Sequence, residues 1–268
     1  MGQPVYPENT MKRRLRSGEA VNGIICNSAS PTLIEIVGYA GFDYVVIETE
    51  HSPITLDGEA MHLIRAAELS GLTVLMRISE NDPSLIHKAL DMGCQGILVT
   101  HVNSKEEARR VVESVKFPPL GNRASGPGRH MGRHRYALDP KTYVNYWNQE
   151  STVMFLVESM EGVNNLEEIV TVPGIDVIGI GQGDLSAELG APTPRFGNPN
   201  CVKAVEKLLA LCKPRGIFVR DIFSDAATAK KWYEKGVRVF EWGFDLGLFQ
   251  KGTKDVAANF QLLKRSKM

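Results

Sequence analysis

Short apolar runs recur along almost the whole chain, and their spacing limits the folds that the chain can adopt. Each run is rich in Val and Ile and lacks the polar alternation of a strand with one face in water. This composition is typical of strands that are covered on both faces of a parallel sheet. The eight runs are residues 23–26, 44–47, 73–76, 97–100, 153–157, 177–180, 217–219 and 237–240.

Capping residues between the runs mark helices. Two Pro residues follow a Ser or Asp, one Ser has a Glu three positions later, and glycines at 41, 71, 93 and 236 suit left-handed C-terminal caps. The N-terminal signals are Ser30-Pro31, Asp82-Pro83 and Ser104 with Glu107. Eight strands with helical crossovers predict an α/β fold, a (β/α)8 TIM barrel that spans 1–268 as one domain. An open doubly wound sheet remains the alternative.

One connection is unusually long. Residues of about 118–138 are rich in Gly, Arg and His, with RHMGRHRY at 129–136. Long loops in compact domains are usually functional or disordered. We expect this loop to lie over a pocket or at a subunit contact.

The charge balance argues against several classes of partner. Lys plus Arg and Asp plus Glu both total 31, so no global field favours nucleic acid or an anionic membrane. No window approaches 18 uncharged apolar residues, and the four cysteines form no CxxC pair. We therefore expect a cytoplasmic protein that binds a small metabolite.

Charged side chains follow several of the predicted strands, where the functional groups of a barrel gather. An isolated acid at such a position is more often an ion-pair member, so the prediction rests on their convergence. Acids from strands five and six repel each other unless a divalent cation such as Mg²⁺ or Mn²⁺ lies between them. The strand-end residues are Glu48, Glu50, His51, Arg77, Glu158, Asp184, Arg220, Asp221 and Glu241. His62, His87 and His101 fall inside helix or strand patterns, and we interpret them as structural.

The segment GIGQGDLSAELG, residues 179–190, contains GxGxGD rather than the GxGxxG of a dinucleotide site, so we expect no nucleotide cofactor. We expect backbone N–H groups around Gly181 and Gly183, at the start of a helix from Leu185, to receive a substrate carboxylate, with Asp184 turned to a metal. No lysine follows a predicted strand, which argues against a Schiff base, and no G-x-S-x-G occurs.

Five motifs together resemble the class II, metal-dependent pyruvate aldolases of the 4-hydroxy-2-oxoheptanedioate aldolase type, in the phosphoenolpyruvate/pyruvate barrel superfamily. They are ETEHSP at 48–53, LMRI at 75–78, KALDMGCQGILV at 88–99, VES at 157–159 and GQGDLSAELG at 181–190. The resemblance implies a lyase that forms or cleaves 4-hydroxy-2-oxo acids from pyruvate and an aldehyde, in aromatic or sugar-acid catabolism. Oxaloacetate decarboxylation is the implied side reaction.

The resemblance also implies roles for individual residues. Glu158 and Asp184 correspond to the ligands of a divalent metal, Mg²⁺, Mn²⁺ or Co²⁺. Arg77 corresponds to the contact with the keto oxygen of pyruvate, which makes it both a catalytic and a substrate-binding residue. His51 corresponds to a base that acts through a metal-bound water.

Two more residues and the assembly follow from the same resemblance. Glu50 matches an acid that helps to hold the arginine and a water network, and Asp91 matches one that orients a histidine of a neighbouring subunit. Such proteins are commonly hexamers, trimers of dimers with an exchanged C-terminal helix, so we expect a homo-oligomer.

The chain departs from the family pattern at four positions. Glu48 replaces a frequent Asp, Leu156 a frequent Gln, and Gln182-Gly183 a common Pro-Ala, which leaves the acceptor aldehyde open. Two alternatives also stay open: a related lyase or decarboxylase that uses a metal enolate on a larger substrate, and a non-catalytic barrel that binds a ligand.

Overall fold

The structure, a computed structural model, describes residues 8–126, 129, 139–193 and 195–265. Its eight strands are all parallel and close into a barrel in chain order, β1 through β8. The prediction of a TIM barrel is therefore confirmed, and the open-sheet alternative is wrong. The strands are β1 (Val21–Cys26), β2 (Tyr44–Glu48), β3 (Thr73–Ile78), β4 (Gly96–Val99), β5 (Thr152–Val157), β6 (Val177–Ile180), β7 (Phe218–Ile222) and β8 (Val239–Phe244).

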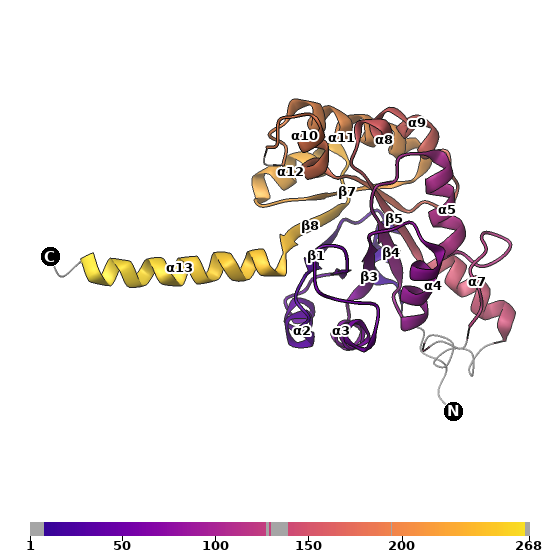
Figure 1. Cartoon of the computed structure of the whole chain (residues 1–268), viewed down its shortest axis with the longest axis horizontal. Helices are drawn as coiled ribbons and strands as arrows, with labels where there is room; N and C mark the ends of the chain where they lie inside the picture. The colour runs from indigo at the N-terminus through magenta and orange to yellow at the C-terminus, as the bar shows by residue number, and fades with distance from the viewer. Residues whose placement is uncertain (1–7, 127–128, 130–138, 194, 266–268) are drawn as a thin grey trace.

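Helices surround this barrel, and those between β2 and β7 lie against its outer wall (Figure 1). They are α1 (Thr10–Arg16), α2 (Pro31–Tyr39), α3 (Gly58–Leu69), α4 (Pro83–Met92), α5 (Lys105–Val115), α7 (Pro140–Glu150), α8 (Met160–Asn164), α9 (Leu166–Ile169), α10 (Gln182–Glu188), α11 (Pro199–Cys212), the 3₁₀ turn η1 (Lys213–Arg215), α12 (Ala226–Lys235) and α13 (Asp245–Arg265). No helix of the described chain is long and apolar enough to cross a membrane.

The predicted helix caps are present. Ser30 and Asp82 cap α2 and α4 ahead of a proline, and Ser104 forms the capping box of α5 with Glu107. Gly93 and Gly236 follow α4 and α12 with φ angles of 120° and 119°. These caps fix where each helix begins and ends, and thereby which residues are left at the strand ends.

The buried strands carry two cores, which explains their continuous apolar sequence. Alternate residues, such as Ile24 on β1 and Ile97 on β4, pack outward under the helices. Their neighbours Ile25 and Leu98 belong to a smaller cluster that fills the barrel interior. Because both faces of each strand are covered, most strand residues are apolar, and the buried pair Arg220 and Glu241 within β7 and β8 is an exception.

Some predicted boundaries are corrected by the structure. The helix expected from Leu185 begins at Gln182, so Asp184 lies in its first turn. The long connection after α5 includes a helix, α7, that the sequence did not indicate. Of the Arg/His-rich segment 129–136, only Arg129 is among the described residues, and it forms an ion pair with Glu68 of α3.

The C-terminal helix α13 extends away from the barrel (Figure 1). Its first residue, Asp245, is anchored to the end of β1 through the backbone N–H groups of Asn27 and Ser28. Beyond that turn, Leu248, Phe249 and Val256 are exposed at 49%, 69% and 70%. The exchange of this helix between subunits stays a prediction.

Candidate functional site at the carboxyl end of the barrel

Arg77 lies at the carboxyl end of the barrel between two acids from β2 and the turn after it. Its Nη1 donates to Glu48 Oε2 at 3.0 Å, and its Nη2 forms a close ion pair with Glu50 Oε2. The Arg77 Nε is buried and has no hydrogen-bond partner. Glu48 is fully buried, and its Oε1 also accepts the backbone N–H groups of Glu50 and His51. The ETEH segment is therefore folded around its first acid, which holds the arginine in place.

Two histidines flank this cluster. The predicted base His51 has a side chain that is 65% exposed, with its Nε2 3.6 Å from Glu50 Oε2. His101 stands outside β4 with a φ of 54°, and its Nδ1 lies 3.4 Å from Glu158 Oε1. The interpretation of His101 as part of a strand is wrong, because the chain turns sharply after Val99.

His62 and His87 lie on helices and not in this cluster. His62 is exposed on α3, and His87 lies on α4, where burial lowers its imidazole pKa. Their placement on helices agrees with the sequence interpretation.

Glu158 directly follows β5, and Asp184 lies exposed in the first turn of α10, after the neighbouring strand β6, where its charge acts on the Glu158 carboxyl. Glu158 is 3% exposed, and its Oε1 accepts the backbone N–H of His101 at 3.0 Å. Burial raises its carboxyl pKa, against the lowering effects of His101 and Arg77, and the negative charge of Asp184 adds a smaller raising effect. A side chain at Gly181 would meet Glu158, since an added Cβ would lie 2.2 Å from Oε2. Gly181 thus makes room for the acid.

These two acids fit a divalent cation. Two neighbouring carboxylates repel each other, a hard cation between them removes this repulsion, and oxygen ligands are those that Mg²⁺ and Mn²⁺ prefer. Within the described part of the chain, no group of three His, Cys, Asp or Glu side chains could by itself hold a metal ion. Glu158 and Asp184 would therefore supply two ligands, leaving the other positions to water and substrate.

Two predicted residues lie apart from this cluster or lack contacts. Asp91 lies on α4, where Arg123 Nη2 donates to its Oδ1 at 3.0 Å, so it does not reach the carboxyl end of its own barrel. Gly183 is exposed in the first turn of α10, with open space where a side chain would be. The substrate-binding roles of Gly181 and Gly183 and the intersubunit role of Asp91 stay predictions.

Arg220 and Glu241 are locked together inside the barrel. They form a close ion pair, both are at most 1% exposed, and the Tyr44 hydroxyl lies 3.3 Å from Glu241 Oε1. Burial raises the pKa of the Tyr44 hydroxyl, so the group stays protonated. These strand-end candidates serve the interior rather than the open face.

Asp221, which was predicted from its place at a strand end, belongs to a second cluster with Gln182 and Arg195. Its Oδ2 accepts from Gln182 Nε2 at 2.7 Å, and its Oδ1 accepts from Arg195 Nη1 at 3.4 Å. Burial raises the pKa of the Asp221 carboxyl to about 6. Arg195 was not predicted, because it lies in the connection from α10 to α11, far along the chain from any strand end.

Comparison with known proteins agrees with this architecture. Residues 23–251 match the HpcH/HpaI aldolase/citrate lyase family. A pyruvate aldolase of Rhizobium etli is 34% identical over 258 residues, which cover 95% of this chain and 98% of that protein.

Two solved structures share the fold. An HpcH/HpaI aldolase from Desulfitobacterium hafniense has a TM-score of 0.86 at 27% identity, covering 94% of this chain and 96% of that one. The citrate synthase SbnG has a TM-score of 0.87 at 28% identity, covering 96% and 99%. The prediction of an enzyme of the aldehyde-lyase class is confirmed at the level of the family. With its closed barrel and a match over most of its length, the chain belongs to the HpcH/HpaI aldolase/citrate lyase family.

Proposed function

We propose that this protein is a divalent-metal-dependent aldolase of the 4-hydroxy-2-oxoheptanedioate aldolase type. It forms and cleaves 4-hydroxy-2-oxo acids through the enolate of pyruvate, and it decarboxylates oxaloacetate as a side reaction. One observation carries the proposal: Arg77, fixed between Glu48 and Glu50, shares the carboxyl end of the barrel with the adjacent acids Glu158 and Asp184.

The charges of this site suit a keto acid that becomes an enolate. Glu158 and Asp184 would hold the divalent cation, which when bound supplies Lewis-acid polarisation of the keto and carboxylate oxygens of pyruvate. Arg77 places positive charge near the keto oxygen, where negative charge develops as a methyl proton leaves. A fixed donor of this kind contributes about 3 to 4 kcal/mol to catalysis.

His51 is the proposed base. Its exposed imidazole can take the methyl proton of pyruvate directly or through water, and Glu50 lies close enough to orient the ring. The enolate carbon then bonds to the carbonyl carbon of the aldehyde, whose oxygen takes up a proton. In the reverse direction the same groups cleave the carbon–carbon bond.

A divalent-dependent cleavage assay tests the proposal. The protein is treated with EDTA, then resupplied with Mg²⁺, Mn²⁺ or Co²⁺ and offered short, sugar-derived and dicarboxylic 4-hydroxy-2-oxo acids. We expect pyruvate release that stops with EDTA and returns with metal. A protein that binds these acids without cleaving them under any metal is a ligand-binding barrel instead.

A second candidate is a lyase or decarboxylase that uses the same enolate on a larger acid. The similarity to a citrate synthase structure supports this second candidate, because that protein shares the fold at a TM-score of 0.87. Decarboxylation of oxaloacetate without cleavage of any simple 4-hydroxy-2-oxo acid would identify this second activity.

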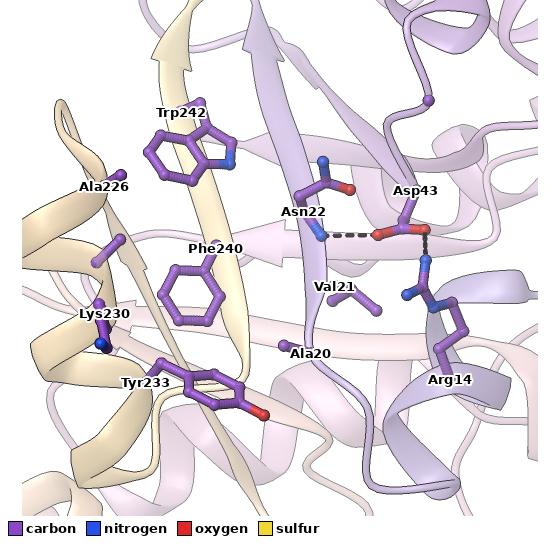
Figure 2. Close-up of a pocket in the computed structure, with 12 residues that line it drawn as sticks. Arg14, Ala20, Val21, Asn22, Asp43, Ala226, Lys230, Tyr233, Phe240 and Trp242 are labelled. Atoms are coloured by element: carbon purple, nitrogen blue, oxygen red, sulfur yellow. Dashed lines mark hydrogen bonds and ion pairs between the residues drawn. The ribbon is translucent and has the colours of Figure 1, made fainter.

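We also propose that the protein assembles by exchanging α13 between subunits. A groove of about 610 Å³ runs along the outer wall of the barrel. Figure 2 shows Phe240 and Trp242 of β8 beside Tyr233 of α12 in this groove, with Asn22 of β1 on its other side. Beside Lys230, the groove has apolar walls from Tyr233 and the two β8 rings, and α13 presents exposed apolar side chains away from its own barrel. A second copy's α13 therefore suits it.

Removing residues 248–268 tests the exchange. We expect the full chain to be an oligomer by light scattering and the shortened chain to dissociate. A monomeric full chain would contradict the proposal.

A further inference from the structure

Arg195 is a partly buried cation with a single weak partner among the described residues. Its side chain is 31% exposed, and among the described residues only Asp221 accepts a hydrogen bond from it, at the long distance of 3.4 Å. Burial lowers the pKa of its guanidinium, and the positive charges of Arg220 and Arg77 add to this lowering, against the opposing charges of Asp221 and Glu241. A guanidinium has five N–H donors, so most of those on Arg195 are left for another acceptor.

Asp221 cannot serve as a full partner, because it is already shared. Its Oδ2 accepts from Gln182 Nε2 at 2.7 Å, and its Oδ1 also accepts the backbone N–H of Ile222 at 2.7 Å. Both of these bonds are shorter than the contact with Arg195. The carboxylate therefore restrains the guanidinium without saturating it.

The loop that carries Arg195 is held at the carboxyl end of the barrel by Gln182. While its Nε2 binds Asp221, its Oε1 accepts the backbone N–H of Phe196 at 2.8 Å. Gln182 is 2% exposed and opens α10, the helix that contains Asp184. Gln182 thus fixes Arg195 with respect to the proposed metal ligand.

Beside Arg195 lies a hollow of about 780 Å³ between the ends of β7 and β8 and the start of α13. We call it the β7–β8 hollow. Four aromatic side chains line its walls, and Lys251 is a second cation beside Arg195. Asp225, the acid among its lining residues, already accepts the backbone N–H of Thr228 as the cap of α12. The lining residues that matter here are Arg195, Phe196, Phe223, Trp242, Phe244 and Lys251.

We propose that Arg195 binds a terminal carboxylate of the acceptor aldehyde, so that the enzyme prefers aldehydes whose far end is anionic. The inference rests on the proposed aldolase function and adds a specificity-determining residue to it. Arg77 would hold the pyruvate half of the product, and Arg195 would hold the other end. The aromatic walls of the β7–β8 hollow suit the methylene groups between the two.

A carboxylate fits this site better than a neutral or larger end group. The planar fork of a guanidinium pairs two parallel N–H groups with the two oxygens of a carboxylate. A neutral end would leave Arg195 partly buried with only its long contact to Asp221, which disfavours binding. The selectivity therefore comes from both attraction to the acid and rejection of the neutral analogue.

The test compares two four-carbon aldehydes, 4-oxobutanoate, which ends in a carboxylate, and butanal, which ends in a methyl group. Each is condensed with pyruvate by the wild type and by Arg195→Met, and kcat and KM are measured separately. We expect the wild type to prefer 4-oxobutanoate. Arg195→Met is expected to lower kcat/KM for 4-oxobutanoate about 10- to 100-fold, chiefly through KM, and to change butanal little.

Two matched variants and an acceptor-free reaction complete the test. Arg195→Lys keeps the charge without the fork and is expected to lie between wild type and Arg195→Met. Arg215→Met removes an exposed arginine at the other end of the barrel and is expected to leave both aldehydes unchanged. Exchange of the pyruvate methyl protons in D₂O, with Mn²⁺ present, requires no aldehyde and is expected to be equal in all four proteins.

The outcomes separate the two proposals. Normal methyl exchange with an unchanged aldehyde preference in Arg195→Met would overturn the role of Arg195 alone. Equal losses for both aldehydes would show a general structural defect and would also overturn it. A wild type that fails to exchange methyl protons would overturn the aldolase function and this inference with it.

Discussion

The two ends of the barrel both contain buried charges, but they use them differently. At the amino end, Lys116 Nζ donates to the backbone oxygens of Asn148 and Ser151 at 2.9 and 2.7 Å, and Lys12 forms an ion pair with Asp176 at 2.8 Å. At the carboxyl end, Glu158 and Asp184 lie beside an arginine that is already paired with two other acids.

The difference separates structural charge from functional charge. The lysines at the amino end have fixed protein partners, so these charges connect α1, α7 and the strands. At the carboxyl end the described acids outnumber the cations close to them, and the excess negative charge calls for a cation from outside the chain. This agrees with the general division of TIM barrels, in which one end carries stability and the other carries activity.

Neutralising the acid pair is the strongest way to break this contrast. Glu158→Gln and Asp184→Asn are each expected to lower aldol cleavage on the order of 10³-fold, because several kcal/mol of charge stabilisation is lost. The raised pKa of the Glu158 carboxyl shows that burial disfavours its charge, so Glu158→Gln is expected not to lower the melting temperature. Calorimetric titration with Mn²⁺ measures the metal affinity, and retained Mn²⁺ binding in both variants would contradict the ligand assignment.

Removing Arg77 affects both stability and activity at the same end. Arg77→Met is expected to lower kcat about 10²- to 10³-fold, as for other fixed donors at a developing oxyanion. It also leaves Glu48 and Glu50 unpaired, which costs about 3 to 5 kcal/mol of unfolding free energy. Arg77→Lys is the matched control for charge without the fork. Unchanged kcat in a folded Arg77→Met would remove Arg77 from the reaction.

The two histidines provide a smaller and more selective effect. His51→Ala is expected to lower aldol cleavage about 10²-fold, the usual contribution of a general base, and to affect oxaloacetate decarboxylation much less. Decarboxylation produces the enolate by loss of CO₂ and requires no base to remove a methyl proton. His101→Ala is the companion variant, since His101 lies against Glu158. If His101→Ala shows this selective loss and His51→Ala does not, the base is His101.

The sequence predicted the barrel and most of its charged strand ends, because both follow from local rules. Apolar runs must be covered on two faces, and the polar residues that end them then lie on one side of a parallel sheet. Glu50, Arg77 and Glu158 were found in this way. The position of His101 beside the acids was not predicted, although it also follows a strand. We had assigned it to the pattern of that strand, and nothing in the apolar run indicates the turn at His101, where φ is 54°.

Other residues could not be found from local rules. Gly181 and Gly183 led us to expect a loop there, since glycine weakens helices, but α10 begins at Gln182, whose side chain binds Asp221 of β7. Arg195 is held at the carboxyl end by its contact with Asp221 and by the bond from the backbone of Phe196 to Gln182. Such positions depend on contacts between distant segments, which one sequence does not reveal.

The weakest effect is expected at the amino end, where a charge change alters stability but not catalysis. Burial, with the positive charge of Lys12 nearby, lowers the pKa of the Lys116 ammonium from its usual 10.5 to about 7. Between pH 7 and 9 the unfolded chain therefore keeps a proton that the folded protein has lost, so folding becomes more favourable as pH rises. Relative to Lys116→Met, the wild type is expected to gain about 2 kcal/mol of unfolding free energy over this range.

Urea unfolding at pH 7, 8 and 9 measures this gain. The comparison of wild type with Lys116→Met isolates Lys116, because the buried thiols, such as Cys26 with its pKa raised to about 12, contribute equally to both proteins. Lys141→Met, at an exposed position on α7, is the matched control and is expected to follow the wild type. A constant difference between wild type and Lys116→Met would mean that Lys116 stays protonated when folded. The amino end would then hold a permanent buried charge. It would differ from the carboxyl end only because its charges have partners within the protein.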